Sequence, residues 1–228
     1  MKTTTILIEG KPFSFEDEID DITYDTIRPI TEQEAKELLE TTKKLFDICG
    51  MRFFLAFGTL LGAVREHGLI EGDEDVDVYV DSEEELRKNL PFLYENGLKL
   101  CRFVENWYYS FRVDGGAFID VYIHRPVDDK FWGRWYDYIE RVIVPKRLVR
   151  NCEEIEFLGG MYFVPSKPER ILKCWYGSTW KIPISNAHDS DGHTLYDWWM
   201  NNKLKICFRS SLSKVRGMVG LPKNLFAK

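Results

Sequence analysis

The segment 75–80, Asp-Val-Asp-Val-Tyr-Val, constrains the fold more than any other part of the chain. Its valines recur at every second position, which is the spacing of side chains on one side of a β-strand. Asp75 and Asp77 then point to the opposite side. We therefore predict a β-strand that presents two neighbouring carboxylates on one side of a sheet.

Patterns elsewhere predict further helices and strands. Capping boxes at 31–34 and 82–85 indicate helix starts, because their side chains bond the free backbone N–H groups there. The sequence Asp114-Gly115-Gly116 predicts a hairpin. The expected helices are 31–49, 60–66, 82–97, 168–175 and one from 194 onward; the expected strands are 52–57, 75–80, 108–113, 117–123, 155–157 and 161–164.

A third carboxylate, Asp120, lies in the second arm of this hairpin. If its strand neighbours segment 75–80, Asp75, Asp77 and Asp120 meet on one face. Like charges at close range disfavour one another, and a bound divalent cation removes that penalty. Oxygen ligands suit Mg²⁺ or Mn²⁺, which also bind substrate phosphates. The residues thus predict a metal site for phosphoryl-type transfer from a nucleotide-linked donor.

Gly58 and Thr59 stand between the strand expected at 52–57 and the following helix. Glycine lets the backbone approach a phosphate, to which helix N-terminal N–H groups and the Thr59 hydroxyl can donate hydrogen bonds. Arg65 is a candidate counter-charge for that phosphate. An ion pair with Glu66 or Asp73 is the other use of this side chain.

An EF-hand calcium loop that starts at Asp73 is the competing interpretation of the acidic segment. Its carboxylates have suitable spacing, but Val78 occupies the position where the loop needs glycine. The sequence also contains no Walker loop and no GxGxxG, GxSxG or HExxH motif. We therefore prefer the strand interpretation.

Charge and composition restrict the partners. A formal net charge of −6 and a sequence pI near 5.4 argue against nucleic-acid binding, which favours an excess of Lys and Arg. The five cysteines are odd in number and form no CxxC pair, as is typical of reduced thiols. The N-terminal apolar run is too short for a signal peptide, and no window has the length of a membrane span. We expect a cytoplasmic protein.

We expect one domain over residues 1–228, with its core at about 30–185 and a basic helical extension at about 194–228. From Lys203 to the end the chain has seven basic residues and no acidic one. This extension either makes a peripheral contact with an anionic membrane surface or forms a solvated helix face.

Two segments closely resemble a known family. Residues 57–70, Phe-Gly-Thr-Leu-Leu-Gly-Ala-Val-Arg-Glu-His-Gly-Leu-Ile, followed by Asp-Glu-Asp-Val-Asp at 73–77, resemble the signature of the LicD family of the nucleotidyltransferase fold, which includes the fukutin-type transferases. Segment 164–180 is similar to the family's distal Pro, Leu, Tyr-Gly and Trp pattern. The resemblance covers about residues 52–183.

The resemblance implies an α/β (α+β) fold with a mixed β-sheet flanked by helices. It also implies a metal-dependent phosphotransferase, which moves phosphocholine or a polyol phosphate from a CDP-linked donor to a hydroxyl of a glycan or glycolipid. Carried over by position, the metal ligands and catalytic residues are Asp75, Asp77 and Asp120, the last also a candidate general base. Gly58 and Thr59 then form the donor-phosphate loop, and Asp73 is a supporting acid.

Two alternatives to this function remain open. The same metal site could serve nucleotidyl transfer to a small molecule, or the chain could be a catalytically silent member that acts as a binding or scaffold module. The chain departs from the family pattern at Glu71-Gly72, where members carry Pro-Trp. A set of aromatic residues either stacks a donor group or packs the core, namely Trp107, Tyr108, Tyr109, Trp132, Trp135 and Tyr136.

Overall fold

The computed structural model describes residues 2–19, 28–114, 116–128, 130, 132–140 and 142–183. The chain divides into two compact units, Met1–Ser178 and Thr179–Lys228. Every element named below belongs to the first unit. The basic extension expected at 194–228 lies outside the described residues, and the single domain over 1–228 stays a prediction.

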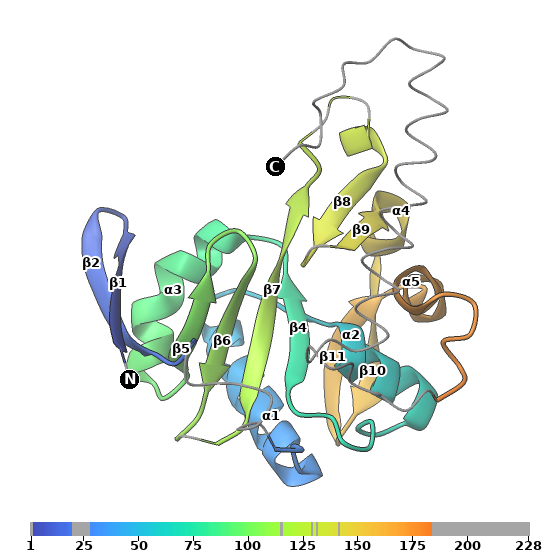
Figure 1. Cartoon of the computed structure of the whole chain (residues 1–228), viewed down its shortest axis with the longest axis horizontal. Helices are drawn as coiled ribbons and strands as arrows, with labels where there is room; N and C mark the ends of the chain where they lie inside the picture. The colour runs from blue at the N-terminus through green and yellow to red at the C-terminus, as the bar shows by residue number, and fades with distance from the viewer. Residues whose placement is uncertain are drawn as a thin grey trace, which may run out of the picture. The chain divides into compact units, whose positions relative to one another are not determined.

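A mixed sheet of nine strands forms the centre of the described part of the first unit (Figure 1). Its strands are β3 (Phe54–Leu55), β4 (Val76–Val80), β5 (Lys99–Val104), β6 (Tyr108–Arg112), β7 (Phe118–Pro126), β8 (Tyr136–Ile139), β9 (Val142–Pro145), β10 (Cys152–Phe157) and β11 (Gly160–Pro165). The order is β10-β11-β3-β4-β7-β6-β5, with β8 paired to β7 and β9 to β8. Strands β4 and β7 are parallel, whereas β3 and β6 run antiparallel to them.

Helices flank this sheet, which confirms the expected fold class. They are α1 (Glu32–Ile48), α2 (Phe57–Leu61), the π-helical turn η1 (Gly62–Glu66), α3 (Glu83–Glu95), α4 (Lys146–Val149) and α5 (Pro168–Tyr176), with a 3-10 turn η2 (Trp132–Arg134). In the view of Figure 1, α1 and α3 pass behind the strands, while α2 and α5 lie near β4 and β11.

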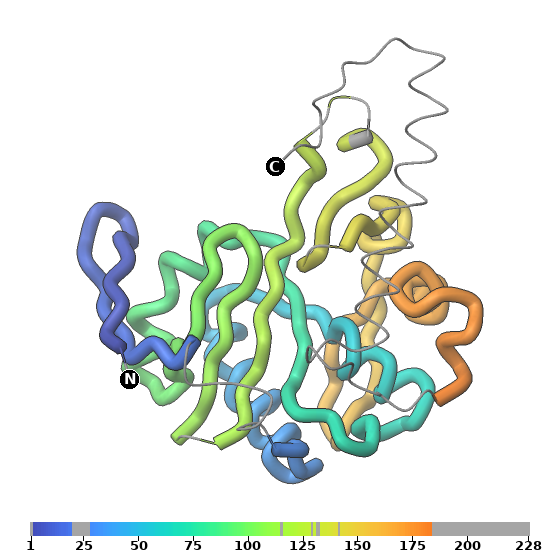
Figure 2. Tube along the Cα trace, in the orientation of Figure 1, coloured from blue at the N-terminus to red at the C-terminus, as the bar shows by residue number. Residues whose placement is uncertain are grey.

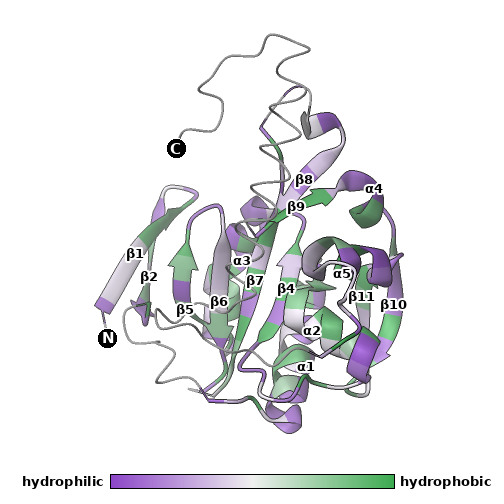
Figure 3. Ribbon diagram, turned by 45° about the vertical axis from the view of Figure 1, so that its right-hand side comes forward, coloured by the Kyte–Doolittle hydropathy of each residue, from purple (hydrophilic) through white to green (hydrophobic). Residues whose placement is uncertain are grey.

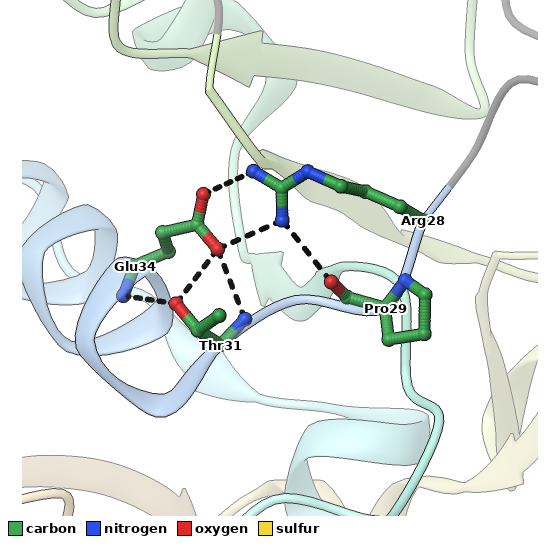
Figure 4. A network of polar contacts seen from close by, with 4 residues as sticks. All are labelled: Arg28, Pro29, Thr31 and Glu34. Atoms are coloured by element: carbon green, nitrogen blue, oxygen red, sulfur yellow. Dashed lines mark hydrogen bonds and ion pairs between the residues drawn. The ribbon is translucent and has the colours of Figure 1, made fainter.

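Helix α1 begins with the expected capping box. The Thr31 hydroxyl accepts a hydrogen bond from the Glu34 N–H, and the Glu34 carboxylate accepts one from the Thr31 N–H. Arg28 adds an ion pair to Glu34, and its guanidinium also bonds the carbonyl oxygen of Pro29 (Figure 4). These donors lower the pKa of Glu34 to about 2, because hydrogen bonds from Arg28 and Thr31 stabilise its charged form.

Strand β4 has two different faces, as its alternation predicts. Figure 3 shows both hydrophobic and hydrophilic residues along β4 and β7. Every residue of β4 is nevertheless buried, so its polar face is covered as well. On that face Tyr79 stacks on Phe54 with ring centroids 4.8 Å apart. The carboxylates of the next residues along this face therefore lie in an enclosed environment.

The strand expected at 52–57 is shorter than predicted, because β3 contains only Phe54 and Leu55. The backbone of Phe57 takes a positive φ of 32°, and α2 starts there rather than at Leu60. Gly58 thus lies within the first turn of the helix. This early turn brings the helix start directly beside β4.

A hairpin that the sequence analysis did not predict precedes α1. Its strands are β1 (Lys2–Ile8) and β2 (Lys11–Asp17), and Figure 2 shows it next to β5 and α3. The Glu18 N–H donates to the carbonyl oxygen of Cys101 over 2.7 Å. Phe13 packs edge-on against Tyr94 of α3. The hairpin is thus a separate two-stranded sheet that packs beside β5 and α3.

Candidate functional site

Asp77 and Asp120 face each other across the parallel strands β4 and β7. They are direct register partners, and their residues are 8% and 7% exposed. The prediction that Asp120 lies on a strand paired with the acidic segment is therefore confirmed. Because paired residues point to the same side of a sheet, the two carboxylates share one buried face.

Gly58 brings a third carboxylate into this group. Its N–H donates to Oδ2 of Asp77 over 2.9 Å. A Cβ at Gly58 would lie 3.2 Å from Oδ2 of Asp73 and 3.2 Å from Oδ2 of Asp77, which is closer than most real Cβ contacts. The absence of a side chain at this position is what lets both carboxylates converge on the start of α2.

Thr59 fixes the helix start to β4. Its hydroxyl accepts a hydrogen bond from the Asp77 N–H over 2.8 Å, and the residue is only 1% exposed. The Ala56 N–H adds a bond to the carbonyl oxygen of Asp77. Thr59 therefore anchors the strand that carries the carboxylates, and donation from its hydroxyl to a phosphate stays a prediction.

The carboxylates of this face raise one another's pKa. Burial comes first, and the charges of the neighbouring aspartates follow, so that the pKa values of Asp75 and Asp77 lie well above the ordinary value. Burial likewise raises the pKa of Asp73 to about 6. The chain thus concentrates buried acidic groups whose ionisation is disfavoured.

Asp120 has a counter-charge that the sequence analysis missed. Arg102 lies 3.1 Å from its Oδ1, and the Ser110 hydroxyl donates a hydrogen bond to the same oxygen. Burial raises the pKa of Asp120, and the Arg102 charge and these hydrogen bonds oppose that increase without cancelling it. The local sequence does not predict this contact. Arg102 is two residues from Leu100, so in a regular strand it would point with Leu100 to the apolar side of the sheet, where Leu100 pairs with Phe111.

Asp73, Asp75, Asp77 and Asp120 together form what we call the acidic face. Aromatic side chains border it. The Tyr122 hydroxyl is hydrogen-bonded to Asp77, which partly offsets the high pKa of that carboxylate. Phe57 contacts Tyr122 edge-on at 5.0 Å and Trp175 of α5 at 4.5 Å between ring centroids. Phe57 thus connects β7 and α5, which are distant in the sequence, beside the site.

The other sequence candidates have different surroundings. Arg65 forms an ion pair with Glu66 at 2.6 Å, which is one of the two expected uses of its side chain. Of the aromatic set, Tyr109 is fully buried and donates to Glu83, whereas Trp135 is 64% exposed. The aromatic set is therefore spread over different environments.

Among the described residues, no group of three or more His, Cys, Asp or Glu side chains is arranged so that it could hold a metal ion as it stands. The carboxylates instead hold donors of the protein itself, such as the Gly58 N–H on Asp77 and Arg102 on Asp120. Among the helices that the structure describes, none is both long and apolar enough to cross a membrane.

A comparison with family models assigns this domain to the nucleotidyltransferase class. The model of the LicD/FKTN/FKRP nucleotidyltransferase domain matches residues 50–167. The chain belongs to this family, and the resemblance drawn from its motifs is confirmed.

Curated relatives of the chain include fukutins. The ribitol-5-phosphate transferase FKTN of Mus musculus is 28% identical over 178 residues, which cover 73% of this chain and 37% of that protein. The same protein of Homo sapiens is 26% identical over 188 residues, covering 77% and 39%. The chain thus spans about two fifths of the length of these relatives.

Solved structures with a similar arrangement are more distant. The crystal structure of the lincosamide antibiotic adenylyltransferase LnuA with lincomycin bound has 14% identity and a TM-score of 0.43, and the match covers 76% of this chain and 98% of that one. The solution structure of the antibiotic-resistance factor ANT(2'')-Ia has 13% identity and a TM-score of 0.49, with 82% and 98% covered.

Proposed function

We propose that this chain transfers a phospho-alcohol, phosphocholine or a polyol phosphate, from a CDP-linked donor to a hydroxyl of a glycan or glycolipid. The observation that carries the proposal is the convergence of Asp73, Asp77 and Asp120 on one buried face, within a LicD/FKTN/FKRP domain. The names of the FKTN relatives support a polyol phosphate, ribitol 5-phosphate, as the transferred group.

We infer that the acidic face takes a divalent cation such as Mg²⁺ or Mn²⁺, because carboxylate oxygens are the ligands that these ions prefer. Oxygens of Asp73 and Asp77 lie 3.2 Å from the point where a Gly58 Cβ would stand. Burial raises the pKa values of both carboxyl groups, so the chain itself does not offset the cost of charging them. Asp75, Asp77 and Asp120 would hold the ion, with Asp73 in support. When bound, it would supply positive charge to the donor diphosphate.

The chain's own residues then have separate tasks. The N–H groups at the start of α2 and the Gly58 backbone would bind the donor phosphates, with Arg65 as a further cation. Asp120, whose Oδ1 is held by Ser110 and Arg102, would accept the proton of the acceptor hydroxyl. The acceptor oxygen forms a bond to the β-phosphorus of the donor, the bond from that phosphorus to the bridging oxygen breaks, and CMP leaves.

Product analysis tests this proposal against nucleotidyl transfer and against a scaffold role. The full chain would be incubated with CDP-ribitol or CDP-choline and a glycan acceptor, and separately with ATP, with and without Mg²⁺. We expect metal-dependent release of CMP that is lost in Asp75→Ala. Release of pyrophosphate from ATP would favour nucleotidyl transfer, and binding of an acceptor without turnover or metal dependence would favour a scaffold.

A further inference from the structure

Arg102 belongs to a polar row that crosses four adjacent strands. In sheet order, Asp77 of β4 pairs with Asp120 of β7, Asp120 with Ser110 of β6, and Ser110 with Arg102 of β5. Such partners present their side chains on the same face. The row therefore joins the acidic face of β4 to a cation three strands away.

A β-bulge places Arg102 in this row. Leu100 pairs with Phe111, but Arg102 pairs with Ser110, so that Cys101 is an extra residue of β5. Without this shift Arg102 would point to the same side as Leu100, which is the apolar side of the sheet. The Cys101 side chain is buried and lies 3.3 Å from the Ser110 carbonyl oxygen. The irregularity thus turns one arginine toward the carboxylates.

The Arg102 guanidinium contacts Ser110, Asp120 and Phe118. Its Nε donates to the Ser110 hydroxyl over 3.0 Å, and one terminal nitrogen lies 3.1 and 3.4 Å from the two oxygens of Asp120. The guanidinium carbon lies 4.4 Å from the centroid of the Phe118 ring. The side chain is only 13% exposed. A planar group with this set of partners is better suited to orienting a carboxylate than a flexible ammonium.

We propose that Arg102 is a positioning residue, which holds the Asp120 carboxylate against Ser110 so that it faces Asp77. This inference rests on the proposed function for its catalytic consequence, but the pairing can be tested without turnover. Arg102 acts through Asp120, the carboxylate that its guanidinium contacts. Ser110 is the second part of the device, since its hydroxyl bridges the arginine and the carboxylate.

A double-mutant cycle on the full 228-residue chain without metal tests the pairing. Arg102→Gln should lower the ratio of folded to unfolded chain when Asp120 is present, because it leaves a buried carboxylate without its cation. This decrease should be at least about tenfold larger than the decrease that Arg102→Gln causes in the Asp120→Asn background. Equal shifts in both backgrounds, measured by denaturant unfolding, would overturn the proposal. If Arg102→Gln does not fold, Ser110→Ala and Arg102→Lys provide the same cycle with smaller changes.

Kinetics separate positioning from general stability. In folded Arg102→Gln, kcat for CMP release should fall about 100-fold with the donor KM nearly unchanged, since a displaced carboxylate affects the reaction more than donor binding. Arg102→Lys should recover part of that loss. Arg112→Gln is the matched control, because Arg112 is a partly buried arginine that pairs with Glu18 at 2.9 Å.

Arg112→Gln should retain wild-type kcat. An unchanged kcat in Arg102→Gln, or an equal loss in Arg112→Gln, would overturn the positioning role. A wild-type chain that transfers nothing would contradict the proposed function alone, because the unfolding cycle would still decide whether Arg102 holds Asp120.

Discussion

The parallel strands β4 and β7 carry carboxylates at both ends, but the two ends differ in how many cations lie beside them. We call the end with Asp77 and Asp120 the near end, and the end with Asp81 and His124 the far end. At the far end, His124 of β7 lies between Asp81, 2.8 Å from Nδ1, and Asp137, 3.1 Å from Nε2. Lys146 lies 3.2 Å from Asp137, and Arg52 lies 3.8 Å from Asp81. Each of these two carboxylates therefore has a basic side chain beside it.

The near end has too few cations for its carboxylates. Asp73, Asp75 and Asp77 gather there with Asp120, and Arg102 is the cation in contact with Asp120. A fold that neutralises one end of a strand pair can also neutralise the other. The proposed cation would supply the positive charge that these carboxylates lack.

Substitution of one carboxylate at each end gives the largest expected contrast. Asp77→Asn should lower the rate of CMP release by at least about 1,000-fold, because it removes charge from the centre of the acidic face. Asp81→Asn changes the far end in the same way and should lower the rate less than about threefold. A comparable loss in both variants, with both chains folded by circular dichroism, would remove the distinction between the two ends.

A methyl group at Gly58 tests whether the near end needs its close approach. Gly58→Ala places a Cβ 3.2 Å from oxygens of both Asp73 and Asp77 and should reduce transfer about 10- to 100-fold. Gly68→Ala is the matched control, since a Cβ there meets nothing within 4 Å. Initial rates of the two purified variants provide the measurement. Equal rates would show that the convergence on Gly58 has no role in transfer.

Stability should respond with opposite signs at the two ends. Without metal, Asp137→Asn should destabilise the fold by about 1–3 kcal/mol, because His124 and Lys146 lose a partly buried partner. Asp75→Asn should stabilise it by about 1 kcal/mol, because it removes a carboxyl group whose ionisation burial and the neighbouring aspartates oppose. Urea unfolding of the chelator-treated variants measures both changes. Destabilisation of similar size in both would contradict the comparison.

The smallest expected effect is a pH dependence at the far end. Burial lowers the pKa of His124, but the hydrogen bonds and charges of Asp81 and Asp137 outweigh it and raise the pKa above 6.5. A raised histidine pKa stabilises the fold fully below the unfolded value of 6.5 and loses that contribution as pH rises through the folded value. The stability difference between wild type and His124→Gln should therefore shrink with increasing pH. A difference independent of pH would contradict this assignment.

The sequence predicts the near end unevenly, for identifiable reasons. Strand β4 follows from the alternation of its valines, and Asp120 from the hairpin signal, since both patterns are local. Arg102 could not be predicted, because the bulge at Cys101 changes the side to which it points and only pairing with β6 produces that change. The positive φ of Phe57, which starts α2 early and sets Gly58 beside Asp77, is likewise a result of packing.

Titration of Mn²⁺ into the metal-free chain tests the central claim most directly. Calorimetry should show binding that is lost in Asp77→Asn, strongly weakened in Asp75→Asn and unchanged in Asp137→Asn. Heat of binding that is absent from the wild-type chain, or that survives Asp77→Asn at full strength, would contradict the account of the acidic face as a cation site.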